Sequence, residues 1–242
     1  MIASVHVVLF DLGNTLFYDN PSAWPRVYRR AEVALWKVLR KAGVRVSAAT
    51  LYGKPGMLLN YYYALRGLGI EEPGTFRVLK DLLYRHNEPL PDPTVAQALR
   101  AMYAVTQSNW RAEDDAASVL QTLLKRGFHL GAVSNGSDDR NAFEMLEKAN
   151  LRRFFEIVIT SAAHGRRKPD ASIFQAALDH FGVGARRTVM IGDSYDADIL
   201  GAHGLGLPTI WITRRVESLP VVRPILPDAT VATLSEIPAL LG

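Results

Sequence analysis

Short apolar runs recur along this chain and alternate with stretches of helical spacing. The five runs that we predict to be strands are Val5–Phe10, Phe128–Val133, Phe155–Thr160, Thr188–Ile191 and Thr209–Ile212. Alternation of this kind is typical of a parallel sheet that is covered by helices. The sequence therefore predicts an α/β fold with a Rossmann-like parallel sheet, in which ligands bind beyond the carboxyl ends of the strands.

Two of the connecting stretches have clear helix ends. Apolar residues at helical spacing from Ala116 onward stop at Gly127, and a second such pattern begins at Asp170 and stops at Gly182. Aspartate before a helix and glycine after one are common end signals. We predict that both stretches are crossover helices that support the sheet.

The stretch from Asn20 to Ser108 has helical spacing but no convincing strand. One predicted helix ends at Gly43 and another follows Pro93. Their apolar stripes are Val27, Ala31, Ala34, Val38 and Ala42 in the first, and Val95, Ala98, Leu99, Met102 and Val105 in the second. A block of about 90 residues is too long for a simple crossover between strands.

This long insertion predicts two domains. Residues 1–19 and 109–242 form the α/β core, and residues 20–108 form an all-helical cap domain over the carboxyl edge of the sheet. After Pro220 we expect a turn-rich tail that closes with a final strand or a short helix.

The composition excludes several classes of function. Hydrophobic residues make up 48% and charged residues 21%, which is ordinary for a soluble globular protein. The 28 basic and 24 acidic residues give a net charge of only +4 without a long basic run, so we expect no nucleic-acid partner. The chain has no cysteine, which excludes disulfides and thiolate chemistry. Because no apolar stretch approaches the roughly 20 residues of a membrane span, we expect a cytoplasmic monomer or homodimer without a membrane partner.

Polar residues stand just after the predicted strands or just before a predicted helix. They are Asp11 after the first strand, Ser134 and Asn135 after the second, Lys168 before the second crossover helix, and Asp193 and Asp198 after the fourth strand. Each alone has an ordinary explanation as a turn, a helix cap or a solvated charge. Together, a carboxylate nucleophile, a hydroxyl donor, a cation and a carboxylate pair at one edge of a sheet outline a phosphoryl-transfer site.

The order of these residues is similar to four motifs of the haloacid dehalogenase-like hydrolase superfamily, in the phosphatase branch with a helical cap inserted after the first motif. The matching motifs are Asp11 to Thr15, Ser134, Lys168-Pro169, and Gly192-Asp193 with Asp198. The resemblance spans the chain end to end. It implies a Mg²⁺-dependent hydrolase that acts on a small phosphorylated substrate.

The resemblance also implies a role for each residue. Asp11 is the nucleophile that becomes an aspartyl phosphate, and its other oxygen binds Mg²⁺. The remaining protein ligands of the metal are the carbonyl of Gly13 and the carboxylate of Asp193, with Asp198 bound directly or through water.

The same resemblance assigns the phosphate-binding residues. Ser134, with Asn135 and backbone amides, holds the oxygens of the transferring group. Lys168 offsets the negative charge that gathers between the nucleophile and the phosphoryl group. Thr15 supplies the hydroxyl that orders the loop of the nucleophile.

Gly13 departs from the family pattern. Most phosphatases of this family have an aspartate there, which protonates the leaving oxygen and later deprotonates the attacking water. General acid–base help of this kind is worth about two to four orders of magnitude in rate. Active members that lack this aspartate include dehalogenases, phosphonate-cleaving enzymes and some sugar-phosphate phosphatases. A substrate whose leaving group departs with little protonation would fit this chain.

Three other functions remain open. The first is 2-haloacid dehalogenase chemistry, which needs no metal and which the retained Asp193 and Asp198 disfavour. The second is phosphonate hydrolysis, which additionally requires a cap lysine that can form a Schiff base. The lysines available in the cap are Lys37, Lys41, Lys54 and Lys80. The third is a catalytically impaired protein that binds a phosphorylated ligand through the same fold.

The cap offers several polar candidates for specificity. Arg26, Arg29 and Arg30 could meet a second anionic group, or they could simply form a solvated helix face. The consecutive tyrosines at 61–63 could line a pocket, although at least one of them must face the core of the cap. The residues that could replace the missing acid are Asp19 near the expected hinge, His164 and His203.

Overall fold

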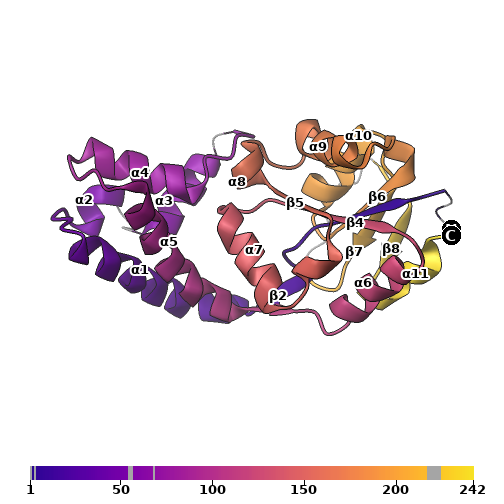
Figure 1. Cartoon of the computed structure of the whole chain (residues 1–242), viewed down its shortest axis with the longest axis horizontal. Helices are drawn as coiled ribbons and strands as arrows, with labels where there is room; N and C mark the ends of the chain where they lie inside the picture. Colours follow the sequence, from indigo (N-terminus) through magenta and orange to yellow (C-terminus); the bar gives the residue numbers. More distant parts are fainter. Residues whose placement is uncertain (1, 3, 54–56, 68, 217–224) are drawn as a thin grey trace.

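The computed structural model describes residues 2, 4–53, 57–67, 69–216 and 225–242. In the described chain, helices α1 to α5 form one part and an α/β layered structure forms the other (Figure 1). Lys54, Pro220 and the start of the predicted tail lie outside the described residues. None of the described helices is both long and apolar enough to cross a membrane.

The α/β part contains a parallel sheet of six strands among the described residues, which confirms the predicted fold class. In spatial order the strands are β5 (Ile157–Thr160), β4 (His129–Ser134), β1 (Val7–Phe10), β6 (Thr188–Gly192), β7 (Thr209–Ile212) and β8 (Ala229–Val231). All five predicted strands are present, with ends that differ by no more than two residues. The tail closes with both alternatives that we expected, the strand β8 and a short helix.

Side chains of β1 alternate between the two faces of this sheet. Val8 and Phe10 belong to one apolar cluster, and Val7 and Leu9 belong to another. The first face is covered by α6 (Ala116–Lys125), α7 (Asp139–Lys148) and α11 (Ile237–Leu240), and the second by α9 (Ala171–Phe181) and α10 (Gly201–Gly204). Because β1 is buried on both faces, the residue after it is held in a well-packed position.

Shorter elements complete the α/β part. The helix α8 (Ser161–His164) follows β5, and a π-helical segment, η5 (Tyr195–Leu200), follows β6. Single 3-10 turns lie at Pro21–Ala23, Gln107–Asn109, Arg152–Phe154, Ala185–Arg187 and Leu234–Glu236.

The helical part has an apolar core of its own. Its helices are α1 (Trp24–Lys41), α2 (Ala48–Tyr52), α3 (Leu58–Arg66), α4 (Thr75–Arg85) and α5 (Asp92–Thr106). The predicted stripe of α1 was wrong by a small rotation, because the buried residues are Val27, Ala31, Leu35 and Leu39. Leucine buries more apolar area than alanine, so the helix turns Leu35 and Leu39 rather than Ala34 and Ala42 toward α5.

Two short strands connect the two parts. β2 (Phe17–Asp19) pairs antiparallel with β3 (Trp110–Ala112), and Asp19 lies opposite Trp110. The sequence analysis did not predict this pair. The division into residues 1–19 with 109–242 and residues 20–108 stays a proposal, which the separate apolar core of the helices supports.

Candidate active site

Asp11 is the first residue after β1, at the carboxyl edge of the sheet. Its backbone N–H donates to the carbonyl of Ile191 at 2.9 Å, which extends the pairing of β1 with β6 by one residue. β1 lies between β4 and β6. The next two strands of this sheet along the chain, β4 and β5, lie on one side of it, and β6, β7 and β8 lie on the other, so the strand order reverses at β1. Such a switch point is where α/β sheets bind ligands. The Asp11 side chain is buried there, with 6% exposed.

Lys168 joins three segments beneath this edge. Its Nζ lies 2.6 Å from Oδ1 of Asp11 and 2.6 Å from Oδ1 of Asp198, and it donates to the carbonyl of Val133 at 2.6 Å. Burial lowers the pKa of the Lys168 ammonium, but the charges of Asp11 and Asp198 outweigh burial and leave that pKa above its usual value. Lys168 is therefore a permanently charged group that neutralises two carboxylates.

Asp198 is held by the turn that follows β6. It lies in the π-helical segment η5, and its Oδ2 accepts a hydrogen bond from the N–H of Ser194 at 3.0 Å. A Cβ atom on Gly192 would lie 2.2 Å from the same oxygen. Glycine at 192 is therefore required for the Asp198 carboxylate to occupy this place. π-Helical turns often occur at functional sites.

Three carboxylates meet at the edge of the sheet. Asp11, Asp193 and Asp198 each have an oxygen within 4.8 Å of the other two. Burial raises the pKa of Asp193 and of Asp198, and repulsion from Asp11 raises both further, while Lys168 opposes the change. Carboxylate oxygens grouped in this way are of the kind that Mg²⁺ prefers as ligands. The indole N–H of Trp211 fixes the Asp193 backbone by donating to its carbonyl at 2.8 Å.

Asn135 contacts the backbone of Lys168 through its side chain. Its side-chain oxygen accepts from the N–H of Lys168 at 2.8 Å, and its side-chain nitrogen donates to the carbonyl of Lys168 at 3.0 Å. Both ends of the amide are thus engaged in holding Lys168. Ser134, the last residue of β4, is buried beside it. Thr15 is fully buried, and its Oγ1 has no hydrogen-bond partner among the described residues.

The sequence matches the family model of the haloacid dehalogenase-like hydrolases over residues 5–206. The chain belongs to this family. It is 29% identical over 205 residues to a glyceraldehyde 3-phosphate phosphatase of Methanothermobacter thermautotrophicus, covering 85% of this chain and 84% of the relative. It is 30% identical over 207 residues to the enzyme of the same name from Pyrococcus abyssi, covering 86% and 81%.

A solved structure has the same fold as this haloacid dehalogenase-like hydrolase. It is a 2-haloacid dehalogenase from Pseudomonas syringae pv. Tomato, which aligns with a TM-score of 0.69 over 98% of this chain and 97% of the other. The two sequences are only 23% identical, so the similarity establishes the fold and says nothing about the substrate.

A cavity of about 250 Å³ lies between the cap helices and the carboxyl edge of the sheet in this hydrolase. Gly13, Ser134 and Asn135 line it from the sheet side. Residues of the cap and the connecting strands that line it are Asp19, Trp24, Tyr28, Leu59, Tyr63, Arg66, Tyr103, Thr106 and Trp110. The cavity therefore brings a potential substrate to the residues that follow β1 and β4.

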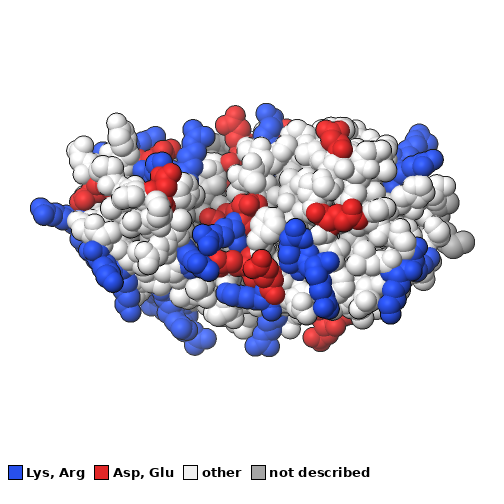
Figure 2. All heavy atoms as spheres, in the orientation of Figure 1, with Lys and Arg blue, Asp and Glu red and all other residues white. Residues whose placement is uncertain are grey.

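Some of the cap residues predicted to determine specificity line the cavity, and others do not. Arg26, Arg29 and Arg30 are exposed and do not line the cavity. Over the middle of the face in Figure 2, between the helical part and the sheet, basic and acidic side chains are interspersed. Of the three tyrosines, Tyr62 is fully buried in the cap core, as expected for one of them, and Tyr63 lines the cavity.

Only one of the candidate substitute acids lies at the cavity. Asp19 lines it, and its Oδ2 accepts from the indole N–H of Trp24 at 2.7 Å. His164 is within 2.8 Å of the Ser172 hydroxyl, away from the cavity, and His203 is exposed on α10.

Two contributions to the site were not predicted from the sequence. One is the steric role of Gly192, for which the only signal was its place beside Asp193. The other is Trp110, whose ring carbon would lie 3.6 Å from a Cβ atom on Gly13. No local pattern marks Trp110, because its position follows from the pairing of β2 with β3.

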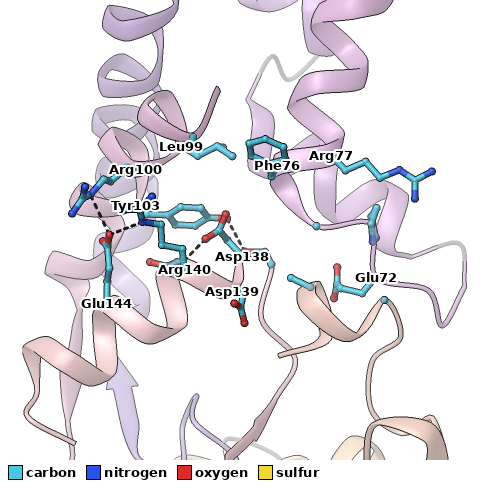
Figure 3. Close-up of a pocket in the computed structure, with 17 residues that line it drawn as sticks. Glu72, Phe76, Arg77, Leu99, Arg100, Tyr103, Asp138, Asp139, Arg140 and Glu144 are labelled. Carbon is cyan, nitrogen blue, oxygen red and sulfur yellow. Dashed lines mark hydrogen bonds and ion pairs between the residues drawn. The ribbon is translucent and has the colours of Figure 1, made fainter. Parts of the chain in front are cut away.

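A second cavity, of about 480 Å³, lies beside the first and shares Tyr103 and Asp138 with it. Figure 3 shows the side chains of Arg100 and Arg140 converging on Glu144 at one end, at 3.1 and 3.3 Å. Gly13, Ser134 and Asn135, which line the first cavity, do not line this one. The second cavity therefore does not reach the residues that directly follow β1 and β4.

Proposed function

We propose that this hydrolase is a Mg²⁺-dependent phosphatase for a small phosphorylated metabolite, with Asp11 as the nucleophile. The observation that carries the proposal is the buried arrangement of Lys168 between Asp11 and Asp198, with Asp193 completing the group of carboxylates. The two relatives that are named glyceraldehyde 3-phosphate phosphatases, similar over most of their length, support the same chemistry.

The metal ligands proposed are the carboxylates of Asp11 and Asp193 and the carbonyl of Gly13. Both oxygens of Asp198 already have partners, Lys168 and the N–H of Ser194, so we assign Asp198 a contact through water. When bound, Mg²⁺ would offset the charge of the phosphoryl oxygens and bring them close to the nucleophile.

In the first half of the reaction, an Asp11 oxygen forms a bond to phosphorus as the bond from phosphorus to the leaving oxygen breaks. The leaving oxygen takes the electron pair of that bond. The Ser134 hydroxyl and the backbone amides after β4 hold the phosphoryl oxygens, and Lys168 remains charged to stabilise the Asp11 side. Asn135 acts on this step by fixing the backbone of Lys168. For Thr15 we keep the role that the family resemblance implies, which is to order the loop of the nucleophile.

In the second half, water attacks the phosphorus of the aspartyl phosphate and releases inorganic phosphate with free Asp11. The proton of the attacking water passes to solvent or to the phosphate itself, because Gly13 offers no side chain to accept it. The leaving oxygen of the first half likewise receives no proton from position 13. The first step therefore favours substrates with stable leaving groups, whereas the second step is the same for every substrate because the leaving group has already departed.

The geometry bears on the other functions that the sequence left open. Lys37, Lys41 and Lys80 do not line the cavity, which disfavours Schiff-base chemistry on a phosphonate, and Lys54 lies outside the described residues. The cluster of three carboxylates disfavours a dehalogenase, which has no use for a metal site. A protein that merely binds a phosphorylated ligand needs no buried nucleophile beside a lysine. We also propose a cytoplasmic location, where phosphorylated metabolites occur, and a monomer or homodimer with no nucleic-acid or membrane partner.

Replacing Asp11 tests this function. Asp11→Asn should lower turnover of p-nitrophenyl phosphate with Mg²⁺ by at least about 10⁴-fold, because the amide is a poor nucleophile and a weaker metal ligand. A chelator should have a comparable effect on the unmodified protein. The matched control is Asp196→Asn, since Asp196 is an exposed carboxylate in η5, three residues after Asp193. Activity that survives in Asp11→Asn would refute the assignment.

A further inference from the structure

The ring of Trp110 lies beside the position from which the side chain of an acid–base residue would extend. A Cβ atom on Gly13 would meet the ring of Trp110 at 3.6 and 4.0 Å. Near Gly13, the leaving oxygen would therefore face an aromatic ring rather than a proton donor. Trp110 reaches this place because β3 pairs with β2, just beyond the loop that contains Gly13.

The Trp110 ring is part of a larger aromatic wall, which we define as Trp24, Tyr28, Tyr63 and Trp110. All four line the cavity that begins at Gly13. The rings of Trp24 and Trp110 meet edge to face with centroids 6.0 Å apart, and those of Trp24 and Tyr28 stack at 4.8 Å. Flat rings that are fixed by one another present a rigid apolar surface, which suits a planar ligand.

The size of the cavity is sufficient for a ring against this wall. An apolar cavity of about 150 Å³ accommodates benzene. The 250 Å³ available here holds a ring of that size and leaves a smaller space beside it.

The charges of the cavity disfavour a second anionic group on the substrate. The charged residues that line it are two carboxylates, Asp19 and Asp138, and one arginine, Arg66. Nε of Arg66 lies 3.3 Å from the buried carboxylate of Glu72, which neutralises it. The described lining therefore has no excess positive charge to attract an anion, which favours an uncharged leaving group.

These observations converge on one class of substrate. Building on the proposed phosphatase function, we propose that the substrate is the phosphate monoester of an uncharged aromatic alcohol, with its ring directly on the ester oxygen and packed against the aromatic wall. When the bond from phosphorus to this oxygen breaks, the electron pair is delocalised into the ring. The aryloxide then leaves without a proton from position 13 and takes one from water afterwards, while Asp11 retains the phosphoryl group.

A matched pair of substrates separates the ring from the acidity of the leaving group. Phenyl phosphate has the ring, whereas hexafluoroisopropyl phosphate has an alcohol of similar acidity without a ring. We expect kcat/KM to favour phenyl phosphate by at least about tenfold, because each aromatic contact contributes roughly a twofold to tenfold factor. Equal kcat/KM values would overturn the proposal, because they would show that the ring contributes nothing beyond the acidity of the leaving group. A nucleoside 5′-monophosphate with a higher kcat/KM than phenyl phosphate would overturn it too.

Substitutions in α1 test whether the aromatic wall causes the preference for phenyl phosphate. Trp24→Leu should bring the ratio of the two kcat/KM values close to one, and Trp24→Phe should retain most of the preference because it keeps a ring. Trp36→Leu is the matched control, since Trp36 lies on the same helix but does not line the cavity. A ratio that Trp24→Leu leaves unchanged, in a protein whose thermal unfolding matches that of Trp36→Leu, would refute the role of the wall.

A further control distinguishes failure of the aromatic substrate class from failure of the phosphatase function. Each substrate is measured with the Asp11→Asn variant in parallel. If phosphate release does not depend on Asp11, the phosphatase function itself fails. If release depends on Asp11 but shows no preference for the ring, the function stands and only the aromatic substrate class is wrong.

Discussion

At the scale of single residues, two glycines define what this site can do, for opposite reasons. Gly192 makes room for a carboxylate, since the Oδ2 of Asp198 lies where its side chain would begin. Gly13 provides no side chain that could act as an acid or base, and the ring of Trp110 lies beside the position where such a side chain would begin. Neither residue has a positive φ, so packing and chemistry, rather than backbone conformation, are the reasons for glycine here.

Gly192→Ala should lower kcat for an aryl phosphate by about 10²-fold. The added methyl group lies within 2.6 Å of three Asp198 side-chain atoms, so the carboxylate must move and Lys168 loses one of its two charged partners. Steady-state kinetics with Mg²⁺ measures the effect. Gly184→Ala is the control, because nothing lies within 4 Å of a Cβ atom there. Equal kcat values in the two variants would contradict this role for Gly192.

Gly13→Asp should restore acid–base help and raise kcat/KM for alkyl phosphates by at least about tenfold. The gain should be smaller for aryl phosphates, whose leaving groups need little protonation. The new Cβ makes only an ordinary contact with Trp110, so the backbone can remain in place. Gly13→Ala adds the same contact without the carboxyl group and is the control. The same gain for both kinds of substrate would mean that protonation of the leaving group is not what limits the enzyme.

At the scale of elements, helix ends determine where charged side chains stand. Asp170 begins α9, and its Oδ1 accepts from the N–H of Ser172 at 3.0 Å. Hydrogen bonds from Ser172 are the main reason that the pKa of Asp170 lies below its usual value, and the Arg166 guanidinium adds to the effect. This cap follows Lys168 by two residues, so it also fixes the segment that delivers the lysine.

Asp170→Ala should lower the free energy of unfolding by about 1 kcal/mol near neutral pH. Because the pKa of Asp170 is depressed in the folded protein, its contribution is present above the unfolded-state pKa of about 4 and is lost as the pH falls through the lower folded-state value. Urea unfolding at about pH 7 and about pH 3 should therefore show a smaller difference between variant and parent in acid. A difference that does not change between the two pH values would contradict the carboxylate cap.

At the scale of the whole molecule, the cap and the sheet meet at a second place besides β2 and β3. The loop between α3 and α4 lies on the segment just before Lys168, where the N–H of Glu72 donates to the carbonyl of Gly165 at 2.8 Å. Arg167 extends from that segment and donates to the carbonyls of Arg66, Gly69 and Glu71. Arg167, the residue beside Lys168, thereby joins the helical part to the α/β part.

Arg167→Ala should loosen this contact without unfolding either part. Loss of three charge-assisted hydrogen bonds should cost about 2 kcal/mol locally, which corresponds to roughly 30-fold faster hydrogen exchange at the amides of Glu72 and Thr75. Amides of β1 and β6 should keep their protection. Arg166→Ala is the control, because the Arg166 side chain pairs with Asp170 inside the α/β part. Equal exchange at Glu72 in both variants would show that Arg167 does not hold the cap.

Much of the fold followed from the sequence because its signals are local. Apolar runs predicted the strands, and Asp170 and Gly182 marked both ends of α9 where the structure has them. The pair of β2 and β3 could not be predicted in this way, because each strand is three residues long and its partner lies more than 90 positions away. The buried face of α1 was predicted with a small rotation, because helical spacing gives alanine and leucine the same weight. Leucine has more apolar area to bury, so Leu35 and Leu39 face the core.

The sequence by itself determined which residues can gather at the edge of the sheet. In a parallel sheet the carboxyl ends of the strands share one edge, so Asp11 and Lys168, 157 positions apart, were expected together before any geometry was known. Only the tertiary structure decided what each group contacts. Asn135 binds the backbone of Lys168, Asp198 fills the space above Gly192, and Trp110 covers Gly13. These contacts depend on the packing of segments that are distant in the chain, and no local pattern of residue types determines such packing.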